Sequence, residues 1–163
     1  GDLILVDNQS IELGKKLIDY GFIDTLQLYF SMIDYKSTLE LLSYAKKNNI
    51  GIIIAAPLGQ GFLSGKFQEN HKFAKNDIRR ITYSEKVIKE RIKKANQFKF
   101  LTNQHRSMAQ IAIAYVLSKS EVSVCTPGSS SPEHVISNAN ASEIKLTDDE
   151  LNQIKEIQDK WDN

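Results

Sequence analysis

The residues best suited to chemistry lie between positions 51 and 66, where an apolar run opens into a loop with three glycines and a lysine. Gly51 to Ala56 contains no polar residue, and Pro57 begins the loop. Glycine lets backbone N–H groups approach a ligand closely, and Lys66 supplies a cation suited to phosphate. The stretch therefore predicts a phosphate-binding loop, and the alternative is a surface turn that merely leaves a strand.

The elements that must position this loop are short strands alternating with amphipathic helices. An unbroken apolar run such as residues 51–56 is typical of a strand buried on both faces of a parallel sheet. Ser107 and Gln110 fit a capping box that starts a buried helix, and residues 58–83 are expected to be loop. Further strands are predicted over residues 3–6, 23–30 and 122–126, and helices over 11–20, 37–47, 84–101, 108–118, 132–140 and from Thr147 onward.

This alternation demands parallel strands joined by right-handed crossovers, which indicates an α/β fold. An open doubly wound sheet and part of an eight-stranded barrel both satisfy the rule. Periodicity alone does not separate the two architectures.

The composition is that of an ordinary globular protein with one domain. The 163 residues are 41% hydrophobic and 25% charged, with a net charge of +1, so no nucleic-acid partner is expected. No apolar stretch approaches the roughly 20 residues of a membrane helix, so we expect no membrane insertion and a cytoplasmic location. Cys125 lies in an apolar run and is interpreted as a buried reduced thiol. No metal site is expected.

Short motifs occur in a fixed order along almost the whole chain. They are Ile23-Asp24-Thr25-Leu26-Gln27 with Phe30-Ser31, Gly51-Ile52-Ile53-Ile54 running into Pro57-Leu58-Gly59-Gln60-Gly61, Leu63-Ser64-Gly65-Lys66, Ser107 to Leu117, Pro127-Gly128-Ser129-Ser130, Asn138, and Leu146-Thr147. Together they resemble the second half of an aldo-keto reductase. The resemblance is strongest to the long-loop branch that includes the potassium-channel β subunits and the bacterial general-stress reductases.

The resemblance implies that residues 1–163 are a single C-terminal half-barrel, strands five to eight of a (β/α)8 TIM barrel with a C-terminal helix. The family's catalytic Asp, Tyr, Lys and His belong to the N-terminal half, which this chain lacks. We therefore expect no catalytic residue here, with His71, His105 and His134 not replacing the missing histidine, and no turnover by this chain alone. For the complete protein the resemblance implies reduction of a small-molecule carbonyl substrate by hydride transfer from NADPH.

The resemblance also implies a set of cofactor-binding residues. It assigns Gln27 and Asn8 to the nicotinamide carboxamide; Pro57, Leu58, Gly59 and Gly61 to the pyrophosphate; Lys66 and either Arg79 or Arg80 to the phosphates; Gly128, Ser130 and His134 to the adenosine phosphate; and Asn138 to the adenine. Four positions depart from the family pattern: Asp7, Ala55, His134 and Ser137 stand where serine, an aromatic residue, Arg or Gln, and glutamate are usual. These departures indicate either a divergent reductase or a reductase that binds its cofactor more weakly.

A second hypothesis is a non-enzymatic half-barrel module, such as a regulatory β-subunit-like protein. Half a barrel has two unpaired strand edges and an exposed inner face, to which we assign Leu5, Leu26 and Ile53. Such a surface predicts self-association, binding of a partner, or pairing with the missing N-terminal half. An independent flavodoxin-like open sheet is a third alternative, although it leaves the ordered motifs unexplained.

Overall fold

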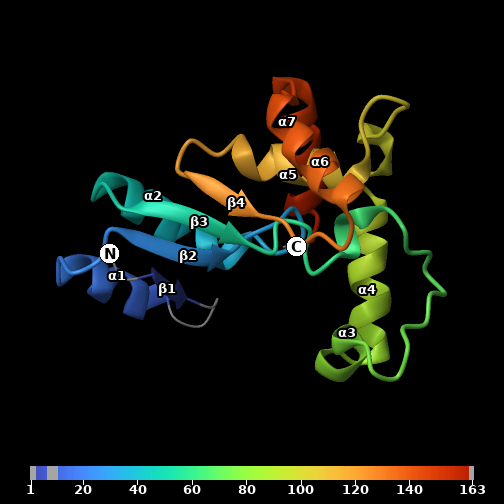
Figure 1. The fold of residues 1–163 in the computed structure, drawn as a ribbon, viewed down its shortest axis with the longest axis horizontal. Coiled ribbons are helices and arrows are strands. Elements are labelled where there is room, and N and C mark those ends of the chain that lie inside the picture. The colour runs from blue at the N-terminus through green and yellow to red at the C-terminus, as the bar shows by residue number, and fades with distance from the viewer. Residues whose placement is uncertain (1–2, 7–10, 162–163) are drawn as a thin grey trace.

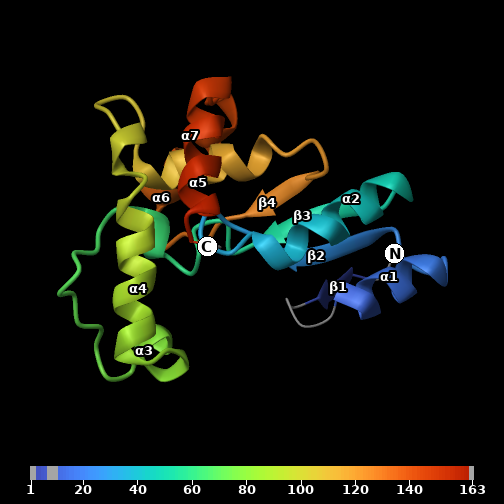
Figure 2. The same ribbon diagram turned by 180° about the vertical axis from the view of Figure 1, so that it is seen from behind.

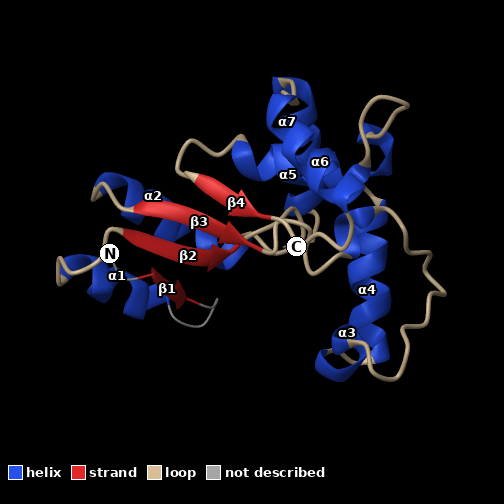
Figure 3. Ribbon diagram, viewed as in Figure 1, coloured by secondary structure: helices blue, strands red, loops and turns tan. Residues whose placement is uncertain are grey.

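The computed structural model describes the backbone of residues 3–6 and all of residues 11–161. The described strands form one parallel sheet in the order β1-β2-β3-β4 (Figures 1 and 3). The strands are β1 (Leu3–Val6), β2 (Thr25–Tyr29), β3 (Gly51–Ala55) and β4 (Val124–Thr126). The α-helices are α1 (Ile11–Asp19), α2 (Leu39–Lys47), α3 (Ile78–Thr82), α4 (Glu85–Asn96), α5 (Met108–Leu117), α6 (Pro132–Asn140) and α7 (Asp148–Asp159).

The spatial order of the strands repeats their order in the chain. Each strand pairs in parallel with the one before it, and no reversal occurs among the described strands. Figure 2 shows α1 and α2 in front of the strands, on the same face of the sheet. Successive strands added on one side, with their helices on one face, are the arrangement of consecutive units in a β/α barrel.

The core fills the space between the sheet and these helices. Leu26 pairs in register with Ile52, and Leu28 with Ile54; each of the four is at most 2% exposed. The assignment of Leu26 to an exposed inner face is therefore wrong. Side chains that pair in register share a face, so Leu26 accompanies Ile52, whereas Ile53 accompanies Gln27 on the other face.

The opposite face of the sheet is less completely covered. Gln27 and Ile53 are both partly exposed and Ala55 is buried, so the face of residues 51, 53 and 55 is less buried than a strand buried on both faces would be. The strand also ends one residue early, at Ala55, because Ala56 turns to a φ of 52°. The side chain of Leu5, the register partner of Gln27, lies outside the described residues.

The capping box before α5 is confirmed. Gln110 N donates to Ser107 Oγ at 3.3 Å, and Ser107 N donates to Gln110 Oε1 at 3.0 Å. The helix that follows is buried along most of its length, as its apolar sequence predicted. It packs against β4 and against α6.

The long segment between β3 and α5 contains more helix than the sequence predicted. Residues 58–83 include a 3₁₀ turn, η2 (Phe62–Ser64), and the short helix α3, which begins where the Asp77 side chain accepts from Arg79 N at 2.9 Å. The helix predicted over 84–101 ends at Asn96 and is followed by the 3₁₀ turn η3 (Lys99–Leu101). Figure 1 shows α3 and α4 standing away from the sheet.

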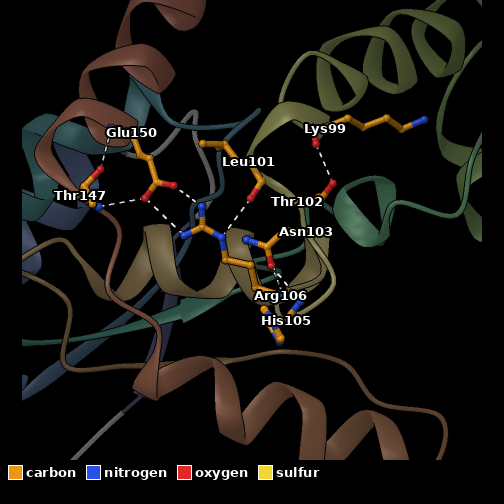
Figure 4. Close-up of polar contacts among 8 residues, drawn as sticks. All are labelled: Lys99, Leu101, Thr102, Asn103, His105, Arg106, Thr147 and Glu150. Carbon is orange, nitrogen blue, oxygen red and sulfur yellow. Dashed lines mark hydrogen bonds and ion pairs between the residues drawn. The ribbon is translucent and has the colours of Figure 1, made fainter.

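Arg106 fastens the segment before α5 to the C-terminal helix (Figure 4). Its Nε donates to Leu101 O at 3.0 Å, its Nη1 donates to Glu150 Oε2 at 3.3 Å, and its Nη2 forms an ion pair with Glu150 Oε1. Glu150 also accepts from Thr147 N at 2.9 Å, which completes a second capping box. The hydrogen bond from Arg106 holds the pKa of Glu150 below its usual range.

Candidate functional site

Two loops meet at the carboxyl edge of the sheet, because parallel strands end on the same side. The first, here called the glycine loop, runs from Pro57 to Lys66 after β3; the second, the β4 loop, covers residues 127–131. Ligands of β/α proteins bind outside the carboxyl ends of the strands. Most residues assigned to cofactor binding lie in these two loops or in the elements that follow them.

The glycine loop is a compact turn whose hydrogen bonds are largely internal. Gly59, Gln60, Gly61 and Gly65 have φ values of 55°, 58°, 88° and 78°. The N–H groups of Gly59, Gly61, Phe62, Leu63 and Ser64 donate to carbonyls of the same turn, at 2.8 to 3.3 Å. Among the described residues, the amides of Leu58 and Gln60 make no backbone hydrogen bond within this turn.

Arg79 lies directly over Gly61. The positive φ favours glycine at position 61, and a Cβ built there would lie in tight contact with Arg79 Nη1, at 3.1 Å. Asp77 holds the guanidinium with two bonds, at 2.9 Å to Nε and 2.6 Å to Nη2, and Phe73 packs under it with its ring centroid 4.0 Å from Cζ. These hydrogen bonds lower the pKa of Asp77 to about 2. Arg79 therefore presents Nη1 to the glycine loop.

Three of the assigned residues meet in one polar group, here called the Lys66 cluster: Lys66, Ser130 and His134. Lys66 Nζ lies 3.4 Å from His134 Nε2, and Ser130 Oγ lies 3.1 Å from His134 Nδ1. Asn138, one turn further along α6, donates to Ser129 Oγ at 2.9 Å. The fold thus brings the end of the glycine loop, the β4 loop and the first turn of α6 together, and a cation, a hydroxyl and an imidazole face one place.

The N-terminus of α6 offers few free backbone amides to an anion. Pro132 has no N–H, and His134 N donates to the N-cap hydroxyl of Ser131 at 3.3 Å. Hydrogen bonds from the Ser131 hydroxyl and from its own backbone N–H lower the pKa of Glu133, so this carboxylate occupies the helix end. An anion in this place would be held by the side chains of the Lys66 cluster rather than by free helix amides.

The remaining assigned residues are spread more widely. Gln27 lies in the middle of β2 rather than at its end, with a partly exposed side chain. Asn8 lies outside the described residues. Pro57 is buried, Leu58 is partly buried, and a Cβ built on Gly128 would meet no atom within 4 Å. Arg80 donates to Phe73 O at 3.2 Å, so of the two candidate arginines it is Arg79 that approaches the glycine loop.

The ion pair between Asp34 and Arg91 was missed in the sequence. Arg91, on α4, donates to both carboxylate oxygens of Asp34, at 2.7 and 2.6 Å, and its guanidinium lies 5.0 Å from the ring centroid of Phe62. Asp34 belongs to the turn after β2, and a Cβ on Gly59 would lie 2.9 Å from Ile33 in that turn. The pair therefore joins α4 to the turn after β2, and both of these segments contact the glycine loop. Asp34 and Arg91 are far apart in the chain, and no local sequence pattern predicts their ion pair.

The described residues give little support to a cysteine nucleophile or a metal site. Cys125 is partly buried in β4, and burial raises the pKa of its thiol, which disfavours the thiolate needed in a nucleophile. No group of three His, Cys, Asp or Glu side chains in the described ranges could hold a metal ion. None of the described helices is long and apolar enough to cross a membrane.

The arrangement fits a phosphate-bearing ligand that extends from the sheet to α6. Arg79 and the amides of Leu58 and Gln60 stand at one end of the glycine loop, and the Lys66 cluster stands at the other. Cations, hydroxyls and free amides are the groups that bind phosphate in proteins.

The model for the aldo/keto reductase family matches residues 8–159. The chain belongs to the aldo/keto reductase family.

Relatives of known activity support this membership and differ in their cofactor. The NADH-specific methylglyoxal reductase of Escherichia coli is 24% identical over 144 residues, which cover 88% of this chain and 44% of that protein. The aldo-keto reductase yakc of Schizosaccharomyces pombe, whose name specifies NADP(+), is 26% identical over 133 residues, or 80% of this chain and 39% of its own. The chain thus spans less than half the length of these aldo/keto reductases.

Solved structures show the same fold. The glycerol dehydrogenase of Gluconobacter oxydans superposes with a TM-score of 0.70 at 20% identity, covering 96% of this chain and 57% of that one. The fold is that of the aldo/keto reductases within the TIM-barrel family, and the doubly wound alternative is wrong. Members of this family are oxidoreductases that use nicotinamide cofactors with small-molecule carbonyl substrates.

Proposed function

We propose that this chain is the cofactor-binding, C-terminal half of an NADPH-dependent carbonyl reductase of the aldo/keto reductase family. Its strands would be the fifth to eighth of the barrel, and residues 1–163 would form one half-barrel. The catalytic acid and its partners would come from the other half, so the chain alone would bind the cofactor without turnover.

One observation carries this proposal: the glycine loop and the Lys66 cluster lie together at the carboxyl edge of the sheet. Lys66 and His134 are 68 positions apart in the chain and lie 3.4 Å apart in the structure. The glycine loop thus has a lysine, an imidazole and a hydroxyl together at one end and an arginine near Gly61 toward the other. Convergence of such groups is what recognition of a polyphosphate requires.

Each part of the cofactor has candidate partners in this chain. Arg79 Nη1 and the amides of Leu58 and Gln60 would bind the pyrophosphate, and the Lys66 cluster would bind the phosphate on the adenosine ribose. Gln27, whose amide can both donate and accept, would orient the nicotinamide carboxamide, and Asn138 would contact the adenine. When bound, the nicotinamide supplies the hydride; the residues described here position it.

Calorimetric titration of the 163-residue chain with NADPH tests the proposal directly. We expect saturable binding that weakens about tenfold in Lys66→Ala and in Arg79→Ala, because each loses a charge-assisted contact to phosphate. Lys155→Ala, which removes an exposed lysine from α7, is the matched control and should bind as the parent chain does. Far-ultraviolet circular dichroism checks that every variant is folded.

Two results would contradict the proposal. One is a folded chain that does not bind NADPH, or that binds it equally well in all three variants. The other is carbonyl-dependent NADPH oxidation by the chain alone, because that would require a catalytic acid among these residues.

A further inference from the structure

We propose that a cavity between residues 69–73 and α4 binds an organic acid, with its carboxylate beside the lysines of α4 and its apolar body against Phe73 and Ile88. The cavity has a volume of about 870 Å³, which is within the range of small-molecule sites in proteins. Neither Lys66 nor Arg79 lines it, so the inference does not depend on binding of the nicotinamide cofactor.

Two segments far from the sheet form the walls of this cavity. One is the chain from Glu69 to Phe73, which precedes α3, and the other is the stretch of α4 from Glu85 to Lys93. Figures 1 and 2 both show the green chain that leads to α3 running alongside α4. Phe73 and Ile88 are 5% and 6% exposed and belong to the hydrophobic core. Each wall therefore contributes an apolar group to the floor of the cavity.

The wall formed by residues 69–73 is held in place by contacts of Phe73. Its ring packs edge-on against Phe62 and Phe67, with the centroids 5.8 and 4.9 Å apart. The ring of His71 lies 4.7 Å from it, and the carbonyl oxygen of Phe73 accepts from Arg80 Nη1 at 3.2 Å. A site whose walls are fixed in advance loses less conformational freedom when a ligand binds.

The charged side chains around the cavity favour an anion. Five lysine and arginine side chains line it against three carboxylates, whereas the net charge of the whole chain is only +1. Glu90, one of the carboxylates, pairs at 3.6 Å with Lys94, which is not part of the lining. A concentration of one sign of charge in a hollow attracts ligands of the opposite sign. The cations are Lys72, Arg80, Lys86, Lys89 and Lys93, and the other two carboxylates are Glu69 and Glu85.

The lysines of α4 that line the cavity are not neutralised by the carboxylates beside them. Lys89 and Lys93 are four positions apart, so they are neighbours on the helix and repel each other. Glu85 stands four positions before Lys89, yet Lys86, Lys89 and Lys93 form no ion pair with any described residue. A carboxylate in the cavity would relieve the repulsion and accept charge-assisted hydrogen bonds from the ammonium groups.

The lining also defines the chemical class of the ligand. The apolar floor favours burial of a hydrocarbon body, and the rings of Phe73 and His71 and the guanidinium of Arg80 are planar groups that stack on aromatic rings. Because Glu69 and Glu85 also line the cavity, an acid with a single charge fits better than a polyanion. We therefore expect an aromatic monocarboxylate to bind better than either its charge or its apolar body alone.

Titration of the ¹⁵N-labelled chain with 2-naphthylacetate, followed by amide chemical shifts, tests the proposal. We expect saturable shift changes concentrated in residues 69–93. The uncharged analogue 2-naphthylacetamide should bind at least about threefold more weakly, because it makes no charge-assisted contact with the lysines. Acetate, which has the charge without the aromatic body, should cause no saturable change over the same concentrations.

A pair of double variants tests whether the lysines of α4 hold the carboxylate. Lys86→Gln combined with Lys89→Gln should raise the dissociation constant of 2-naphthylacetate about three- to tenfold, since two exposed charge-assisted contacts are lost. Lys145→Gln combined with Lys155→Gln is the matched control. It removes two exposed lysines, one before α7 and one on it, and should leave the dissociation constant unchanged. The spectra themselves show whether each variant is folded.

Three results would overturn the proposal. The first is the absence of saturable shift changes in residues 69–93. The second is equal affinity of the parent and the Lys86→Gln, Lys89→Gln variant for 2-naphthylacetate. The third is equal affinity of the parent for the acid and for its amide, because the cavity would then be an apolar groove that does not select anions.

Discussion

Gly61 is a residue whose replacement the local geometry disfavours in two ways. Its φ of 88° lies in a region that side chains rarely adopt, and a Cβ there would lie 3.1 Å from Arg79 Nη1, which is a tight contact. The loop therefore depends on this glycine in two ways. One is the backbone turn, and the other is the position of the guanidinium above it.

We predict that Gly61→Ala lowers the free energy of unfolding by about 1–2 kcal/mol, because alanine is strained at positive φ. It should also weaken NADPH binding, because Arg79 must move. Gly128→Ala is the control, since a Cβ there meets nothing within 4 Å and no positive φ is required; its effect should stay within about 0.5 kcal/mol. Urea denaturation measures the free energy of unfolding of both variants, and equal losses of stability in the two would refute the argument.

The C-terminal helix α7 is joined to the rest of the molecule by polar contacts at both ends. At its start Glu150 pairs with Arg106 (Figure 4), and near its end Gln158 Nε2 donates to Met32 O at 2.8 Å. Gln158 is only 4% exposed, and its hydrogen bond to Met32 gives this buried amide a partner inside the protein. These contacts attach α7 to the turn after β2 and to the segment before α5.

We predict that Glu150→Gln destabilises the chain by about 1 kcal/mol at pH 7, since a partly buried bidentate pair with arginine is lost. The pKa of Glu150 is lower in the folded protein than its ordinary 4.5. Its contribution is therefore complete above pH 4.5 and is lost as the pH falls through the folded value. Urea denaturation at pH 7 and pH 3.5 should show the difference between parent and variant shrinking. Glu156→Gln, exposed on the same helix, should have little effect at either pH.

The helix starts were predictable where their signals are local. Ser107 and Gln110 cap α5 with residues three apart, and Thr147 and Glu150 do the same for α7. The end of α4 was missed because apolar residues continue past Asn96, through Phe98 to Leu101, in η3. Helix α3 was missed because five residues are too few for a periodic pattern, although its Asp77 cap was visible in the sequence.

The sequence named the residues of the Lys66 cluster only through the family resemblance, and their assignment to cofactor binding stays a prediction. Contacts such as Lys66 with His134, or Arg91 with Asp34 across 57 positions, depend on how separate elements pack, and no spacing rule reveals them. The same limit explains the error at Leu26. The alternation along one strand was clear, but the register with β3, which fixes the face, is a tertiary property.

At the scale of the whole molecule, the sheet of the described strands has edges at β1 and at β4, and apolar side chains are exposed on β4 and on α6, the next helix in the chain. Val124 on β4 is 46% exposed, and Val135 and Ile136 on α6 are 56% and 61% exposed. Helix α6 packs on α5 along one side, so its other side is where the next helix of a closed barrel would lie. Such a surface fits a molecule that is completed by further β/α units.

We predict that the 163-residue chain alone associates with itself, because unpaired parallel edges and exposed apolar groups bind one another. Sedimentation velocity at increasing concentration should show species larger than a monomer, and Val135→Glu combined with Ile136→Glu should shift them toward the monomer. Ile78→Glu with Ile81→Glu is the matched control, because these residues are 67% and 68% exposed on α3, away from the sheet edges. A polypeptide carrying the first four β/α units of an aldo/keto reductase should compete with self-association, since it offers the strands that both edges lack. A compact monomer at all concentrations would mean that the edges are protected and that the chain needs no second half to close its sheet.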